Sequence, residues 1–86
     1  MNYIIVSFKN RNNLYPFINT LKRSGIFASI INTPKNISSS CGLSAKVEYR
    51  YYSKIVEILS ISSKANLIGV FSVTKHGSFE QIQRLL

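Results

Sequence analysis

Cys41, the single cysteine of the chain, is the residue with the most intrinsic nucleophilic chemistry. Several residues near Cys41 in the sequence carry groups that can bind an anion. They are Lys35, Ser38, Ser39, Ser40 and Gly42. The thiolate is the reactive form of cysteine, and its pKa of about 8.5 falls beside cations and amide-rich anion sites. Serine hydroxyls can also donate to a sulfur anion or to an anionic substrate. We therefore predict that Cys41 reacts, that Lys35 supplies a cation, and that the serines and a turn at Gly42, which aims backbone N–H groups inward, bind the anion.

Other chemistries fit this sequence poorly, although one structural alternative stays open. A free cysteine often only packs in a core, so Cys41 is either reactive or buried and inert. The spacing of a phosphate-binding P-loop is absent. One cysteine and one histidine do not complete a closed metal site, and no aspartate is present to orient His76 in a hydrolase triad. We expect no metal and no cofactor, and at most group transfer by a carrier rather than turnover by an enzyme.

Length and composition indicate one domain spanning residues 1–86. Hydrophobic residues make up 45% of the chain, which is enough for one core. Eleven Lys and Arg face three acidic residues, giving a formal net charge of +8. Such an excess attracts polyanions such as RNA, or an acidic protein surface.

The same features point to a cytoplasmic protein without a membrane partner. A small secreted domain normally carries several cysteines, whereas this chain has one. The N-terminal run is strand-like and lacks the charged and apolar regions of a signal peptide. No stretch approaches the roughly 18 apolar residues of a membrane span.

The hydrophobic pattern predicts strands and helices in the order βαββαβ, followed by a terminal helix. Strands are expected at residues 3–8, 26–31, 43–47 and 67–73. Helices are expected from residue 12 or 13 to the glycine at 25, from 51 or 52 to about 62, and from 78 to 86. The late start of the first helix follows from Pro16, which is tolerated near a first turn. The last helix rests on a capping box formed by Ser78 and Gln81.

This order favours an α+β, ferredoxin-like fold with an additional C-terminal helix. In that arrangement the first and third strands lie in the middle, and the second and third are antiparallel neighbours. A connection between such neighbours usually takes about 2–5 residues. Here it spans residues 33–42, and long loops on rigid scaffolds often carry function.

The segment Pro34-Lys35-Asn36-Ile37-Ser38-Ser39-Ser40-Cys41-Gly42-Leu43 resembles the signature of a family of small bacterial proteins, the selenium/sulfur carrier-like proteins. Their pattern is a proline, a basic residue, a spacer with an Ile-Ser step, and a Cys-Gly pair before an apolar strand. The first strand and the Gly25-Ile26 step also agree, so the resemblance covers about residues 3–73. The chain departs from the family in Lys35, where arginine is common, in Pro16 and in the segment 78–86.

The resemblance implies a carrier in which Cys41 holds sulfur or selenium as a persulfide or selenosulfide, with donor and acceptor proteins as partners. Two other functions stay open. The first is RNA binding, with these candidate contacts: Lys9, Arg11, Lys46, Arg50, Lys75, Tyr49, Tyr51 and Tyr52. The second is a protein-interaction module, including a homodimer with residues 78–86 across its seam. A thiol sensor would use the same cysteine as a carrier.

Overall fold

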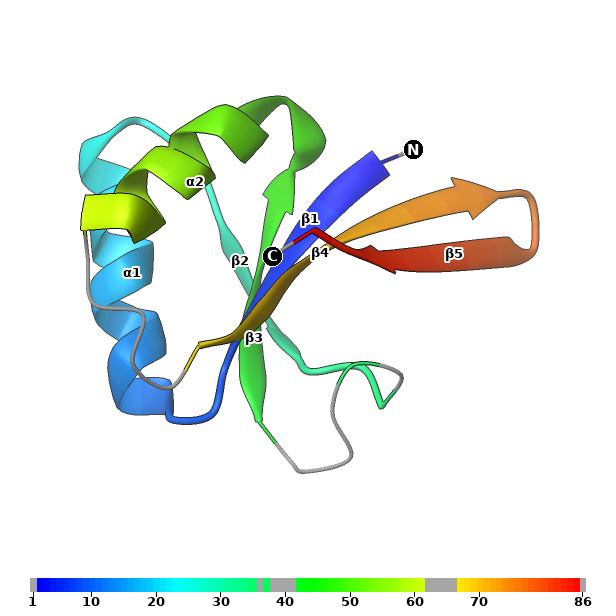
Figure 1. The fold of residues 1–86 in the computed structure, drawn as a ribbon, viewed down its shortest axis with the longest axis horizontal. Helices are drawn as coiled ribbons and strands as arrows, with labels where there is room; N and C mark the ends of the chain where they lie inside the picture. The colour runs from blue at the N-terminus through cyan, green and yellow to red at the C-terminus, as the bar shows by residue number, and fades with distance from the viewer. Residues whose placement is uncertain (1, 36, 38–41, 62–66, 86) are drawn as a thin grey trace.

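The computed structural model describes residues 2–35, 37, 42–61 and 67–85. Their elements are β1 (Asn2–Phe8), α1 (Arg11–Arg23), β2 (Ser29–Asn32), β3 (Leu43–Glu48), the 3₁₀ turn η1 (Tyr49–Tyr51), α2 (Tyr52–Ile61), β4 (Leu67–His76) and β5 (Phe79–Arg84) (Figure 1). Neither helix in this part of the chain has the length and apolar content needed to cross a membrane.

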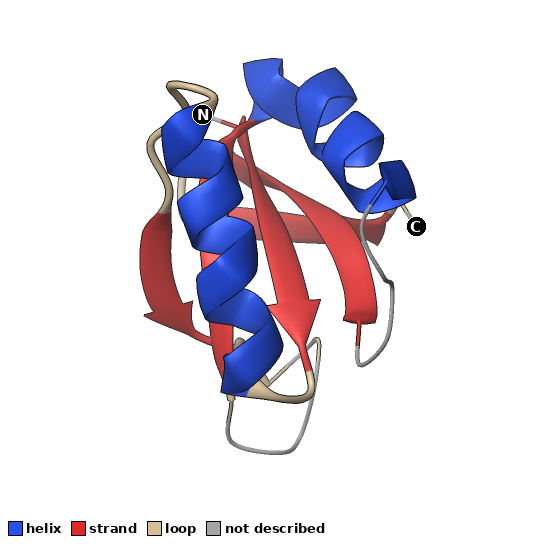
Figure 2. Cartoon of the chain, turned by 90° about the vertical axis from the view of Figure 1, so that its left-hand side faces the viewer, coloured by secondary structure: helices blue, strands red, loops and turns tan. Residues whose placement is uncertain are grey.

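The strands form one antiparallel sheet in the order β2-β3-β1-β4-β5. As predicted, β1 and β3 lie inside the sheet, and β2 and β3 are antiparallel neighbours. Both helices pack on the same face of the sheet, as Figure 2 shows. None of the described helices lies on the other face, which we call the helix-free face. Sequence periodicity therefore placed the first four strands and both helices correctly, within a few residues at their ends.

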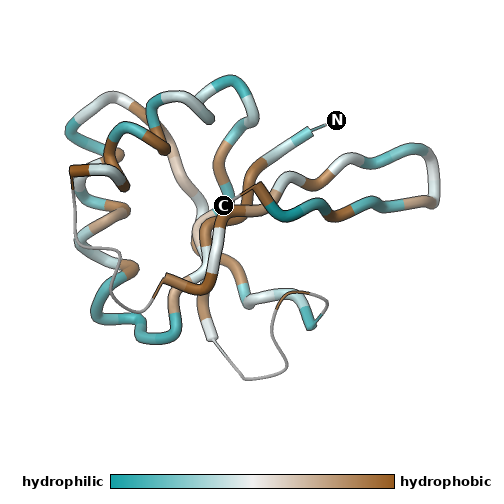
Figure 3. Tube along the Cα trace, viewed as in Figure 1, coloured by the Kyte–Doolittle hydropathy of each residue, from teal (hydrophilic) through white to brown (hydrophobic). Residues whose placement is uncertain are grey.

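The core lies between the helices and the middle strands, where apolar residues gather in Figure 3. The prediction that the first strand is buried on both faces is confirmed, because residues 4–7 of β1 are all fully buried. Ile4 and Val6 face the helices, whereas Ile5 and Ser7 face the helix-free side. The helices contribute Leu14, Phe17 and Leu21 from α1 and Ile55, Ile58 and Leu59 from α2.

The first helix begins earlier than predicted, at Arg11, with Asn10 as its N-cap. The side chain of Asn10 accepts a hydrogen bond from the Asn12 N–H at 2.9 Å, which replaces a bond that the helix cannot make itself. Pro16 therefore lies inside α1, beyond its first turn. The bond that Pro16 lacks would have gone to residue 12, so the defect falls next to the capped end, where little helix precedes it.

The predicted C-terminal helix is wrong, because residues 79–84 form the strand β5. Gly77 has φ +61° in the two-residue turn between His76 and Phe79, a conformation that suits a hairpin. The resulting ladder with β4 extends beyond the pairs of the strand, since the Leu85 N–H donates to the Val70 carbonyl at 2.7 Å. A Gly-Ser pair between two strand-like runs was the sequence signal for this turn, and the capping-box pattern obscured it.

Candidate functional site

Thr33 and Gly42, the residues on either side of segment 34–41 in the sequence, form a backbone contact that we call the neck. The Thr33 N–H donates to the Gly42 carbonyl at 2.9 Å, one step beyond the last pair of the β2–β3 ladder. A Cβ placed on Gly42 would lie 3.5 Å from Thr33 Oγ1 and 3.9 Å from the carbonyl oxygen of Phe8, at the end of β1. Gly42, the residue that follows Cys41 in the sequence, therefore lies beside the end of β1 and beside Thr33, the residue that follows β2.

Three hydroxyl groups extend from the neck into the sheet. Ser44 Oγ lies 2.6 Å from Thr33 Oγ1 and 2.8 Å from Ser7 Oγ, and both serines are fully buried. In each pair either oxygen can be the donor. A direction from Ser7 to Ser44 and from Ser44 to Thr33 lets both buried serines donate, and in that direction the proton of Thr33 is not used within the row. These three residues were not among the predicted site residues, since each is an ordinary strand or loop residue when seen in the sequence alone.

The structure places part of the predicted site and leaves the rest outside the described residues. Cys41, Ser38, Ser39 and Ser40 fall outside them. Lys35 is exposed and lies in a turn in which the Ile37 N–H donates to the Pro34 carbonyl at 2.9 Å. Gly42 is half-buried at the neck.

The described glycines with positive φ are Gly25 and Gly77, and Gly42 is not among them. The predicted turn that aims successive N–H groups inward also involves Cys41, which lies outside the described residues, so the role of Gly42 in binding an anion stays a prediction. The atoms nearest to a Cβ placed on Gly42 are at ordinary van der Waals distances, so a small side chain fits there.

Positive charge surrounds this end of the sheet. Lys9 and Arg11 are exposed between the end of β1 and the first turn of α1. The neck lies at the same end of β1, because the carbonyl of Phe8 is close to Gly42. The three glutamate carboxylates each lie within 4 Å of a cation, in the pairs Glu48–Arg50, Glu57–Lys54 and Glu80–Lys75. The net positive charge is consequently carried by other cations, including Lys9, Arg11 and Lys35.

The residues proposed for RNA binding do not gather on one surface. Lys9 and Arg11 lie at the neck end of the sheet, whereas Arg50 and the tyrosines 49, 51 and 52 lie at the other end of β3. Arg50 is also engaged, since its guanidinium bonds Glu48 at 2.9 Å and lies 4.8 Å from the Tyr51 ring centroid. Lys75 lies on the β4–β5 hairpin, 3.8 Å from Glu80.

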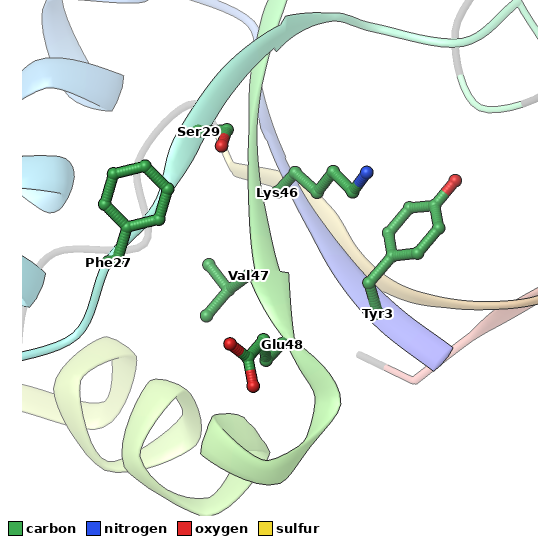
Figure 4. Close-up of a pocket in the computed structure, with 6 residues that line it drawn as sticks. All are labelled: Tyr3, Phe27, Ser29, Lys46, Val47 and Glu48. Atoms are coloured by element: carbon green, nitrogen blue, oxygen red, sulfur yellow. The ribbon is translucent and has the colours of Figure 1, made fainter. Parts of the chain in front are cut away.

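A pocket of about 220 Å³ opens on the helix-free face. Figure 4 shows its lining residues, Tyr3, Phe27, Ser29, Lys46, Val47 and Glu48. The Lys46 ammonium lies 4.4 Å from the centroid of the Tyr3 ring, toward which its side chain points. Burial raises the pKa of the Tyr3 phenol, and the Glu80 carboxylate raises it further. Neither Tyr3 nor Phe27 was predicted to belong to a site.

The geometry can be set beside known proteins. Residues 2–67 match the model of the family described as "Putative Se/S carrier protein-like". The match covers more than half of the 86 residues and includes β1 through α2 and the whole cysteine segment. No curated protein and no solved structure matches the chain.

Proposed function

The chain belongs to the Se/S carrier protein-like family, and we propose that it carries sulfur or selenium on Cys41 between donor and acceptor proteins in the cytoplasm. The family match carries this proposal, because the matched residues contain the only cysteine together with the strands that hold its segment at the neck. The positive charge of Lys9, Arg11 and Lys35 supports it, since cations favour the reactive thiolate.

In the proposed loading step, the Cys41 thiolate attacks the outer sulfur of a donor persulfide, R–S–SH. The new S–S bond forms on Cys41 as the S–S bond of the donor breaks, which leaves Cys41–S–SH and the thiolate R–S⁻. In the discharge step, an acceptor thiolate attacks the outer sulfur of Cys41–S–SH and takes it as its own persulfide, which restores the Cys41 thiolate. Selenium would follow the same steps as a selenosulfide. Because the chain has no second cysteine, the thiol that discharges Cys41 belongs to a partner.

The roles of the surrounding groups follow from this chemistry. Lys35 supplies positive charge to the anion on Cys41, while Ser38, Ser39 and Ser40 and the backbone N–H of Gly42 supply hydrogen-bond donors. The Thr33 hydroxyl supplies a further donor in the direction that runs from Ser7 through Ser44 to Thr33, in which both buried serines donate. Lys35 retains the charge of the arginine that is common in the family, but not its two-pronged geometry.

We further propose that β1–α1–β2–β3–α2–β4 is a ferredoxin-like unit to which β5 has been added at the edge. The order of its first four strands, β2-β3-β1-β4, supports this assignment. So do the two helices on one face. In such a unit the connection between the two halves is the one between β2 and β3, which includes Cys41 in the sequence.

The rate of alkylation by iodoacetamide as a function of pH tests whether Cys41 has the reactivity of a carrier. We expect a titration midpoint below the usual thiol value of about 8.5. Lys35→Gln should raise that midpoint, whereas Lys35→Arg should leave it low. A slow reaction with a normal or raised midpoint would mean that Cys41 only packs, and the carrier proposal would then be abandoned.

A further inference from the structure

The strand β2 forms one edge of the sheet. Among the described strands it pairs with β3 alone, at the end of the strand order, and Figure 2 shows it at the side of the sheet. The bond from the Thr33 N–H to the Gly42 carbonyl fixes the phase of the ladder. Since antiparallel strands alternate, Ser29 and Ile31 direct their backbone groups toward β3, and Ile30 and Asn32 direct theirs outward. Within the described residues, none of the backbone hydrogen bonds outside the regular elements uses these outward groups.

The two edges of the sheet are not equally protected. Proteins usually guard an edge strand with charged side chains or proline, because unpaired backbone groups invite another strand. The outer strand β5 carries Glu80 and Arg84. In contrast, β2 reads Ser-Ile-Ile-Asn, has no charged residue, and leaves 46% of Ile30 exposed. The edge formed by β2 is therefore the one suited to accept a strand, although only over a short length.

The pocket beside β2 can receive a side chain from such a strand. Phe27, just before β2, is 79% exposed, and Figure 4 shows it on the opposite side of the Lys46 stem from Tyr3. A strand added to a sheet edge points alternate side chains to one face. One of these faces is the helix-free face, where Ser29 and Phe27 line the pocket. Backbone pairing for affinity and a side-chain pocket for specificity are the two parts of recognition by strand addition.

Charge identifies the kind of partner. A second copy of this chain would bring another net charge of +8 to the edge, which opposes association. An acidic partner would instead be attracted, with Lys46 at the pocket and Lys35 shortly after the strand. The carboxylate at the pocket, Glu48, is already neutralised by Arg50 at 2.9 Å.

We propose that the outer edge of β2 docks an extended, acidic segment of a partner protein, which adds a strand to the sheet and places an apolar side chain in the pocket between Phe27 and Tyr3. Because β2 runs directly into Thr33, a docked carrier partner would be held at the start of the segment that contains Cys41 in the sequence. That last step rests on the proposed function, whereas the docking does not.

A phage-displayed library of random peptides, selected on the Cys41→Ser protein, tests the docking without sulfur chemistry. We expect enriched peptides that alternate apolar and acidic residues. When one is synthesised and added, the amides of Ile30 and Asn32 should become protected from hydrogen exchange by NMR. Phe27→Ala should weaken binding by about tenfold or more, as truncation of a central anchor does. The matched control is Phe79→Ala, which removes a phenylalanine that is 63% exposed at the other edge, and it should leave affinity within about twofold.

The proposal is overturned if no acidic peptide is enriched, if the amides protected lie elsewhere, or if the two phenylalanine variants weaken binding equally. It is also overturned if sedimentation equilibrium shows a dimer in which the Ile30 amide is protected before any peptide is added, because a second copy then occupies the edge. Loading of wild-type Cys41 with sulfur is measured separately, so failure of the docking and failure of the carrier function give different results.

Discussion

At the scale of single residues, the hydroxyl groups of Thr33, Ser44 and Ser7 form a hydrogen-bonded row that begins beside Gly42, the residue that follows Cys41 in the sequence. Residue type alone singled out Cys41, since thiolate chemistry belongs to one side chain of this chain. The hydroxyls of Ser7, Ser44 and Thr33 could not be predicted, because their contact depends on the register of three strands. A central strand that is buried on both faces shows no alternation of apolar and polar residues. Ser7 therefore does not interrupt such an alternation, and its position in the sequence does not mark it as a functional residue.

The hydroxyl chain leads to a prediction about the thiol. Thr33→Val keeps the shape of the side chain but removes its donor, and it should raise the midpoint of Cys41 alkylation if Thr33 donates to the anion. Thr33→Ser keeps the hydroxyl and should behave as the wild type does. Ser72 is a buried serine that does not belong to this row of hydroxyl groups, so Ser72→Ala controls for general destabilisation. An unchanged midpoint in Thr33→Val would show that Thr33 serves only the neck.

The environment of Tyr3 leads to a second prediction. Burial and Glu80 raise its pKa, so the folded chain holds the phenol proton more tightly than the unfolded chain, whose tyrosine titrates near 10.0. This contribution to stability is complete below about pH 10 and is lost as the pH rises through the folded pKa. Tyr3→Phe lacks the titrating group, so its free energy of unfolding in urea should change differently from that of the wild type as the pH rises from about 10 through the folded pKa. The same change in the two proteins would contradict the assigned environment.

At the scale of elements, long periodic segments were predictable and the C-terminal segment was not. Leu14, Phe17 and Leu21 repeat at helical spacing, and all three are buried in α1. Residues 79–84 gave a similar apolar spacing, but pairing with β4 overrode it once Gly77 had turned the chain. Helical periodicity in a short segment is weak support for a helix when a strand edge lies within reach of a tight turn.

Backbone conformation distinguishes two glycines that look equivalent in the sequence. Gly25 has φ +77° at the end of α1, where its N–H donates to the Lys22 carbonyl at 3.0 Å. Gly25→Ala should cost about 1–2 kcal/mol of unfolding free energy, because a Cβ disfavours this conformation. Gly42→Ala should cost less, since Gly42 has no positive φ and its nearest neighbours would be at ordinary contact distance. Urea unfolding of both variants measures the difference, and an equal or larger loss for Gly42→Ala would contradict it.

At the scale of the whole molecule, the core lies on one side of the sheet and the charge lies around it. The sequence predicted the helices that cover the core. It could not show that the three glutamate carboxylates pair with neighbouring cations, which leaves the net charge of +8 to the remaining residues. Nor could it show that an exposed phenylalanine lies beside an unpaired sheet edge, because both facts depend on strand order.

This division between core and surface predicts that two truncations differ strongly in their effect on the free energy of unfolding. Leu14→Ala removes a fully buried side chain and should cost about 2–5 kcal/mol, a large share of the stability of a small domain. Phe27→Ala removes a side chain that is mostly exposed to solvent. It should therefore change the free energy of unfolding by no more than about 0.5 kcal/mol. A large loss for Phe27→Ala in urea unfolding would show that this ring belongs to the core.

The central claim is that Cys41 carries sulfur, and its most direct test is the intact mass of the native protein after exposure to a small-molecule persulfide. We predict a gain of one sulfur atom that disappears when a thiol acceptor is added and that Cys41→Ser abolishes. No gain in the wild type, or an equal gain in Cys41→Ser, would contradict the carrier function.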